Sequence, residues 1–260
     1  MDAFDHEHSD RGSAKTDPVR HLETLEDEVA TLKRRLRSAD SDGDADTNVD
    51  AATTDLRARF EAAAGELQAA VAAANGGHEP INRRTGGTIT PLEPVPADVA
   101  LADIAHALAN LTRFTGQGRD HYSVARHAVH VSHEVEARGG SPDAIRWGLL
   151  HDATEAYLAD VPAPVKRSLP GYTHAESELA AAVRDAFEIE LSRAERRLVH
   201  AADKAVGRDE LARHFPDGGF ERPALEFDAD ALEREWRTGA ASSDTERFVD
   251  RANELDIECD

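Results

Sequence analysis

Apolar residues recur three and four positions apart through most of the chain beyond residue 97. This spacing places them on one face of an α-helix and predicts a series of amphipathic helices around a common core. Ser123 and Ser141 are good N-cap residues, Asp98 offers a third cap, and Pro142 suits the first position of its helix. The helix after Ser141 is expected to continue toward Tyr157. Further helices are expected over 173–187, 192–214, 228–237 and 242–255.

The N-terminal part of the chain has a different pattern. Residues 1–52 predict a disordered lead, a short helix over 21–37 with a leucine seam of about two heptads, and an acidic linker. A dimerising helix and an accessory helix lying on the main domain both explain this seam. The alanine-rich stretch 53–77 predicts an accessory helix that ends at Asn75-Gly76-Gly77.

The segment between this appendage and the main helices is rich in proline and glycine. Residues 78–96 contain four prolines and the pair Gly86-Gly87, which predict either a loop or a short hairpin over 84–90. The predicted fold class is therefore all-α: a helical domain over 78–255 behind an N-terminal helical appendage.

Composition and charge narrow the class of protein. The chain has 30 Lys and Arg against 51 Asp and Glu, a net charge of −21, and only four of its basic residues are lysines. This balance is typical of a salt-adapted, haloarchaeal-type surface, with an ordinary acidic protein as the alternative, and it disfavours tight binding to long nucleic acid. The lone cysteine, Cys259, excludes a disulfide framework and a cysteine zinc site. With neither a signal peptide nor a long apolar stretch, we expect a cytoplasmic protein without membrane contact.

One segment carries most of the candidate chemistry. His151, Asp152, Glu155 and Asp160 follow two leucines. On a helix Glu155 shares a face with His151 and Asp152, and Asp160 comes just after the helix. Burying three carboxylates together is costly unless a cation neutralises them. The segment therefore predicts a divalent metal site, and imidazole with carboxylate suits Mn, Co, Fe, Ni or Zn.

Two residues outside this segment are the remaining candidate ligands. His127 lies on the apolar stripe of the preceding helix, and Asp203 lies among alanines within a later helix. An aspartate in such surroundings either pairs with a base or reaches a metal.

These residues resemble the metal signature of the HD-domain metal-dependent phosphohydrolases. Three segments are similar to the branch that contains the 5′-deoxyribonucleotidases, and together they place the resemblance over about 79–215. The matching segments are 113–116, 122–127 and 150–162. The resemblance implies an HD-domain helical bundle with one divalent transition metal. The implied ligands are His127, His151, Asp152 and Asp203.

The resemblance also implies roles for the neighbouring residues. Glu155 matches the carboxylate that activates or orients the attacking water, and Asp160 matches a second catalytic carboxylate near the leaving group. Arg113 matches a phosphate-contacting arginine. Phe114 stands where the deoxyribonucleotidases have tryptophan, which leaves the sugar and base assignment open. Lys166 and its neighbour at 167 are further candidates for phosphate contacts.

The implied function is hydrolysis of a phosphate ester in a small phosphorylated metabolite, with a nucleoside 5′-monophosphate as the expected substrate. Two alternatives stay open: a hydrolase of cyclic or alarmone-type nucleotides, and a non-catalytic sensor of metal and nucleotide. The presence of both Glu155 and Asp160 favours an enzyme over a sensor. A homo-oligomer formed through the leucine seam is a further open alternative.

Overall fold

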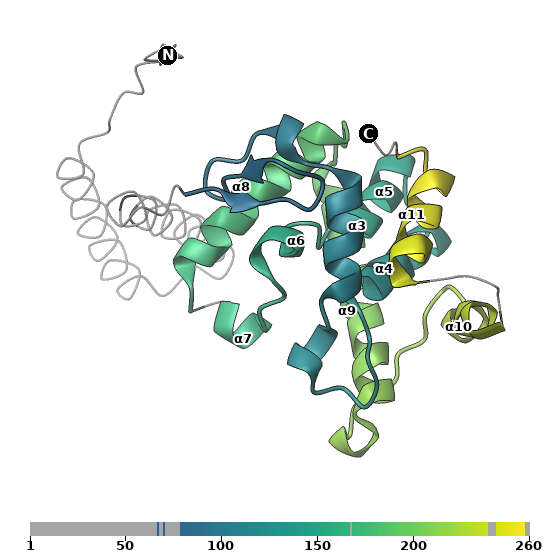
Figure 1. The fold of residues 1–260 in the computed structure, drawn as a ribbon. Helices are drawn as coiled ribbons and strands as arrows, with labels where there is room; N and C mark the ends of the chain where they lie inside the picture. Colours follow the sequence, from purple (N-terminus) through teal and green to yellow (C-terminus); the bar gives the residue numbers. More distant parts are fainter. Residues whose placement is uncertain (1–66, 68–69, 71–78, 167, 239–242, 258–260) are drawn as a thin grey trace, which may run out of the picture. The chain divides into compact units, whose positions relative to one another are not determined.

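The computed structural model describes residues 67, 70, 79–166, 168–238 and 243–257 (Figure 1). The chain divides into two compact units, 1–71 and 72–260, and the elements below belong to the second. The segments predicted over 1–52, and nearly all of the helix predicted over 53–77, lie outside the described residues and stay predictions. Among the described residues, no helix has the length and apolar character needed to cross a bilayer.

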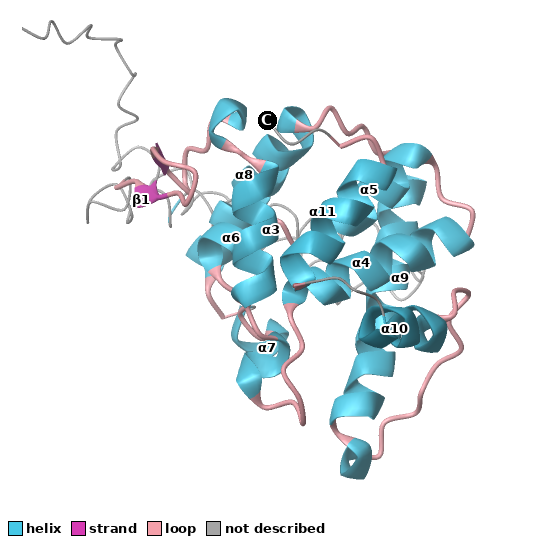
Figure 2. Cartoon of the chain, turned by 45° about the vertical axis from the view of Figure 1, so that its right-hand side comes forward, coloured by secondary structure: helices cyan, strands magenta, loops and turns pink. Residues whose placement is uncertain are grey.

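The second unit is a bundle of helices with one very short hairpin, so the all-α prediction is confirmed (Figures 1 and 2). The strands are β1 (Ile81–Asn82) and β2 (Thr88–Ile89), and the short 3₁₀ helices are η1 (Pro96–Asp98), η2 (Arg113–Gly116) and η3 (Pro216–Gly218). The α-helices are α3 (Leu101–Asn110), α4 (Val124–Ala137), α5 (Pro142–Leu150), α6 (Glu155–Leu158), α7 (Ala163–Lys166), α8 (Pro170–Ala186), α9 (Arg193–His214), α10 (Ala229–Thr238) and α11 (Asp244–Glu254).

Helix α4 is central, because it packs against α3, α5, α9 and α11 (Figure 1). Its apolar residues enter two clusters of buried side chains, one shared with α3, α5 and α11 and the other with α5 and α9. Val124 and Val129 belong to the first cluster, and Val131 and Val135 belong to the second. Close packing on these sides holds α4 rigidly, which suits a helix that presents a functional side chain.

The predicted N-caps are mostly confirmed. The hydroxyls of Ser123 and Ser141 each accept the backbone N–H three residues later. Ser192 and Ser243 do the same and complete capping boxes with Glu195 and a second glutamate at the same spacing. The Asp98 cap is wrong: Asp98 ends η1, and α3 begins after Ala100 without a side-chain cap. The extended backbone at Val99 and Ala100 separates the two helices.

The helix after Ser141 is shorter than predicted. Helix α5 ends at Leu150, four turn residues follow, and α6 begins at Glu155. In the turn, the amides of Ala153 and Glu155 donate to the carbonyls three residues earlier, at 2.9 Å each, so the chain tightens to 3₁₀-type bonding. The prediction of one continuous helix to Tyr157 is therefore wrong.

The hairpin that the sequence left open is present, shifted toward the N-terminus. Ile81 pairs with Ile89 across a turn in which Gly86 and Gly87 have φ of +103° and +73°, values that favour glycine. The side chain of Asp103 on α3 accepts the Thr85 amide at 2.8 Å and its hydroxyl at 2.7 Å. These bonds fasten the hairpin to the bundle.

Candidate metal centre

Three of the four predicted ligands form a compact cluster. His127 from α4, His151 from the end of α5 and Asp203 from α9 each offer a donor atom, all within 4.8 Å of one another. Asp203 Oδ1 lies 3.3 Å from His127 Nε2 and 3.9 Å from His151 Nε2. Donor atoms that share one ion at about 2.1 Å are about 3–4 Å apart. The cluster thus has the dimensions of a metal site.

Asp152 lies beside both imidazoles. Its Oδ2 is 3.6 Å from His127 Nε2, and its Oδ1 is 3.3 Å from His151 Nε2. It faces each ring with a different oxygen and is not part of the cluster of three, so its role as a fourth ligand stays a prediction.

The hydrogen bonds of the two histidines orient them for metal binding. His151 Nδ1 lies 2.9 Å from the carbonyl oxygen of Gly148, which can only accept, so Nδ1 carries the proton. His127 Nδ1 lies 2.7 Å from a carboxylate oxygen of Glu210. Both Nε2 atoms are buried and have no hydrogen-bond partner among the described residues. A buried nitrogen without a hydrogen-bond partner is energetically costly unless it binds a ligand. In metal-binding histidines, one ring nitrogen usually binds the ion while the other donates to a carboxylate or a backbone carbonyl.

The carboxylates around the cluster favour a positive charge on His127, as the pKa values in the cluster show. Burial and the charge on Arg113 oppose protonation of His127, but Glu210 and Asp203 outweigh both and raise its pKa to about 10. Burial likewise opposes ionisation of Asp203, yet its contact with His127 and the charge on His151 lower its pKa well below the usual range. Without a metal, a proton therefore supplies the positive charge at His127 Nε2. A divalent cation would displace that proton and neutralise more of the negative charge.

Arg113 lies at the edge of the cluster with part of its guanidinium free. Its Nη2 is 3.2 Å from Glu210 Oε2, and its Nη1 is 3.9 Å from Asp152 Oδ2. Its Nε is buried and has no hydrogen-bond partner in the part of the chain that the structure describes. Arg113 is thus held at one nitrogen and keeps donors available for an anion.

Phe114 follows Arg113 but turns toward other aromatic rings. The Phe114 ring lies edge-on to Phe215, with centroids 5.3 Å apart, and 5.8 Å from His214. It stays within 5.6 Å of the Arg113 guanidinium. The structure places it near the predicted phosphate contact, and its substrate-binding role stays a prediction.

The two predicted catalytic carboxyl groups occupy the same region. Glu155 is 4% exposed, and its Oε2 has no hydrogen-bond partner among the described residues. Burial, with the charges of Asp152 and Asp160, raises its pKa to about 9. Burial also raises the pKa of Asp160, with a further contribution from Asp152 and against the charge of Arg113. Lys166 Nζ approaches Glu155 Oε1 at 3.6 Å, while residue 167 lies outside the described part of the chain.

Two buried residues near the centre were missed by sequence reasoning. Glu210 is 1% exposed and contacts both His127 and Arg113. Its signal was the seven-residue spacing from Asp203, which places both on one face of α9. His130 is 4% exposed and contacts the Tyr122 hydroxyl at 2.8 Å.

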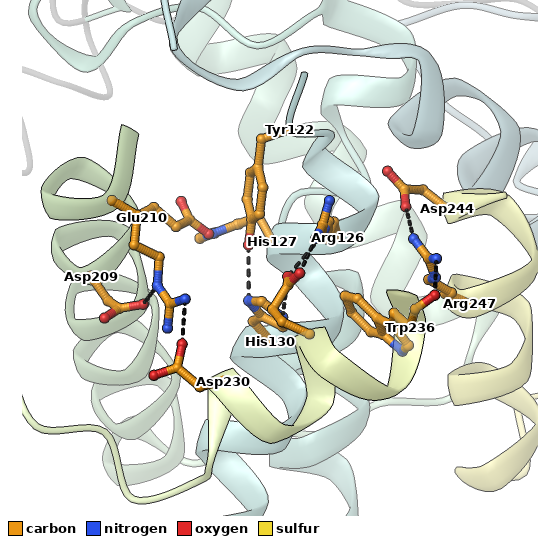
Figure 3. Close-up of polar contacts among 12 residues, drawn as sticks. Tyr122, Arg126, His127, His130, Asp209, Glu210, Asp230, Trp236, Asp244 and Arg247 are labelled. Atoms are coloured by element: carbon orange, nitrogen blue, oxygen red, sulfur yellow. Dashed lines mark hydrogen bonds and ion pairs between the residues drawn. The ribbon is translucent and has the colours of Figure 1, made fainter. Parts of the chain in front are cut away.

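A polar network behind the centre fastens α10 to α4 (Figure 3). Glu233 on α10 pairs with Arg126 and lies 3.3 Å from His130 Nε2. The Trp236 ring stacks on His130 with centroids 5.2 Å apart. Tyr122 joins this network to the centre, because its carbonyl accepts the backbone N–H of Arg113 at 2.9 Å.

A cavity of about 730 Å³ lies in another part of the unit. It is lined by the hairpin, the start of α3 and the end of α8, with Arg83, Arg146 and Asp185 among its residues. None of its lining residues belongs to the metal cluster, so this cavity is separate from the candidate metal site.

Comparison with known proteins places the chain among relatives. No family model matches it. It is 43% identical over 91 residues to the uncharacterized protein YfdR of Escherichia coli, a match covering 35% of this chain and 48% of YfdR. It is 38% identical over 132 residues to the uncharacterized protein RCAP_rcc00048 of Rhodobacter capsulatus, covering 48% of this chain and 67% of that protein. The chain belongs to the family of the Rhodobacter protein. It spans about half the length of YfdR, and neither relative's name states an activity.

In this member of the family, the backbone between the two catalytic candidates is strained. Ala159 has φ of 69° and ψ of 160°, a region that is essentially restricted to glycine. Its carbonyl accepts the Tyr172 hydroxyl at 2.6 Å, which helps to hold the conformation. The strained residue therefore lies directly before Asp160 and shortly after Glu155, the two predicted catalytic residues.

We expect Ala159→Gly to stabilise the protein by about 1 kcal/mol. Relief of about 1–3 kcal/mol of backbone strain outweighs the greater entropy that glycine gives the unfolded chain. The midpoint of thermal unfolding should rise by about 2–4 °C for a domain of this size. Ala201→Gly, at an exposed position inside α9, is the matched control and should lower the midpoint. A lower midpoint in both variants would contradict the strain at Ala159.

Proposed function

We propose that the protein is a metal-dependent phosphohydrolase of the HD-domain superfamily that acts on a small phosphate ester, with a nucleoside 5′-monophosphate as the expected substrate. The observation that carries the proposal is the pair of orphaned Nε2 atoms of His127 and His151, which face Asp203 at metal-site distances. An arginine with free donors and two carboxyl groups with raised pKa values adjoin this cluster. These are the parts that hydrolysis of a phosphate ester needs.

The contacts of each residue suggest its role in the proposed reaction. A bound metal would supply positive charge for the phosphoryl oxygens and acidify a water molecule. The Nε of Arg113, which has no partner among the described residues, and its Nη1, whose contact with Asp152 is long at 3.9 Å, would bind the phosphate, because Glu210 already holds Nη2. The Glu155 carboxyl group, with one oxygen free of partners, would hold the attacking water. The charge of a bound metal would favour the ionised form of Glu155, and this form can take the proton of the water. Asp160, whose raised pKa favours its protonated form, would donate a proton to the leaving alkoxide.

A substrate screen of the full chain, stripped and reloaded with Mn, Co or Zn, tests the proposal. We expect release of inorganic phosphate from nucleoside or deoxynucleoside monophosphates, and loss of that release after chelation. Turnover restricted to cyclic nucleotides or alarmones would favour the alternative hydrolase. Binding of nucleotide by the metal-loaded protein without any turnover would overturn the enzyme and favour a sensor.

A further inference from the structure

Glu210 lies between the metal cluster and the candidate phosphate contact. One of its oxygens is 2.7 Å from His127 Nδ1, and the other is 3.2 Å from Arg113 Nη2. Figure 3 shows the side chains of Glu210 on α9 and His127 on α4 turned toward each other. At 1% exposure, Glu210 has little access to water, so these two partners satisfy its charge.

Helix α9 contacts both nitrogens of the same imidazole. Asp203 and Glu210 are two helical turns apart, and Asp203 faces His127 Nε2 while Glu210 faces Nδ1. A carboxylate oxygen of Glu210 lies 2.7 Å from His127 Nδ1, so Glu210 accepts from this nitrogen and fixes a proton of His127 on Nδ1.

The same carboxylate aims the guanidinium of Arg113. Arg113 makes its short side-chain contact at Nη2 with Glu210, and the contact of Nη1 with Asp152 is longer, at 3.9 Å. Gly207, one turn before Glu210 on α9, does not fix the guanidinium sterically, since an added Cβ there would make only an ordinary contact with Nη2, at 3.8 Å. The position of Arg113 relative to the cluster therefore depends on Glu210.

We infer that Glu210 is a positioning residue that orients His127 toward the metal and Arg113 toward the phosphate, so that one buried carboxylate sets the geometry of both subsites. This inference rests on the proposed function for the identity of the two ligands. Glu210 touches neither ligand itself. It acts through the tautomer and ring orientation of His127 and through the fixed end of the guanidinium.

The test uses Glu210→Gln in the full chain, which keeps the shape of the side chain and removes its charge. The amide cannot accept from His127 and from Arg113 at once, because one of its two ends donates. We expect affinity of the metal-stripped protein for Co²⁺ or Mn²⁺ to fall about tenfold or more. At saturating metal, affinity for inorganic phosphate should also fall. Glu210→Gln and Arg113→Lys should weaken phosphate binding less than additively, since both act on one guanidinium.

Glu134→Gln is the matched control. Glu134 on α4 is also fully buried and pairs with an arginine, Arg138, but its carboxylate accepts the amides of Glu226 and Phe227 in the segment before α10. This control should lower the unfolding midpoint and leave both affinities unchanged. Equal losses of affinity in Glu134→Gln would show a general effect of buried glutamates and overturn the inference.

The remaining outcomes separate this inference from the proposed function. Wild-type affinities in Glu210→Gln would overturn the inference alone. Loss of metal affinity without loss of phosphate affinity would overturn the link to Arg113. A wild-type protein that takes up no metal would overturn the proposed function itself, and the metal titration shows this before any variant is compared.

Discussion

Glu155→Gln should retain its metal and lose hydrolysis by about 10²–10⁴-fold, the usual contribution of a general acid–base group. Glu155 lies near the ligands without belonging to the cluster, and one of its buried oxygens has no partner among the described residues. Glutamine fills the same space but takes no proton from water. Elemental analysis together with phosphate release measures both parts of the expectation.

The control for this variant is Glu176→Gln. Glu176 is the nearer carboxylate partner of Lys166, at 2.6 Å against 3.6 Å for Glu155. If the loss in Glu155→Gln came only from releasing Lys166, Glu176→Gln would show a comparable loss. We expect it to stay close to wild-type turnover. Unchanged turnover in metal-replete Glu155→Gln would refute the role of Glu155.

The pH dependence of the free energy of unfolding checks that Glu155→Gln is folded and that burial disfavours the ionised form of Glu155. The folded metal-free protein keeps the Glu155 proton until about pH 9, whereas the unfolded chain releases it near its ordinary value of 4.5. At Glu155 the folded state therefore binds more protons, and the contribution of Glu155 to wild-type stability falls as the pH rises through this window. Glutamine does not titrate. In chelator, the stability of Glu155→Gln relative to wild type should rise from about pH 5 to about pH 8.

Local signals in the sequence predicted the helices well and their junctions less well. The N-caps at Ser123, Ser141 and Ser192 involve residues within one turn, so the sequence contains all that decides them. No glycine or proline follows the end of α5 at Leu150 until Pro162, and the apolar pattern continues through it. Directly after this break, Asp152 contacts His127 and His151 contacts Asp203, and a local pattern does not contain such tertiary contacts.

The candidate site shows the same division. His127, His151 and Asp203 were predicted from residue types and their resemblance to a known signature, and the structure brings them together. Glu210 was missed because α9 has the pattern of a charged surface helix around it. Its burial results from Arg113, 97 positions away, and His127, 83 positions away. The seven-residue spacing from Asp203 shows only that the two residues share a face of α9, and a single sequence does not reveal these long-range partners.

His151→Ala should abolish stoichiometric metal binding and, with it, hydrolysis. The substitution removes one of the two buried Nε2 donors, while the turn that holds residue 151 keeps its backbone bonds. We expect one metal ion per wild-type chain and less than about a tenth of that in the variant, since each ligand group contributes strongly to such a site. Elemental analysis after gel filtration measures the content.

A second readout does not depend on catalysis. A ligand that binds only the folded state stabilises it by about 2.7 kcal/mol at one hundred times its dissociation constant. Added metal should therefore raise the unfolding midpoint of the wild type and leave that of His151→Ala unchanged. His200→Ala is the matched control, because this histidine is 65% exposed and lies 3.9 Å from Asp203 Oδ2, outside the cluster. His200→Ala should respond to metal as the wild type does. A metal-dependent rise in His151→Ala equal to that of the wild type would place the ion elsewhere.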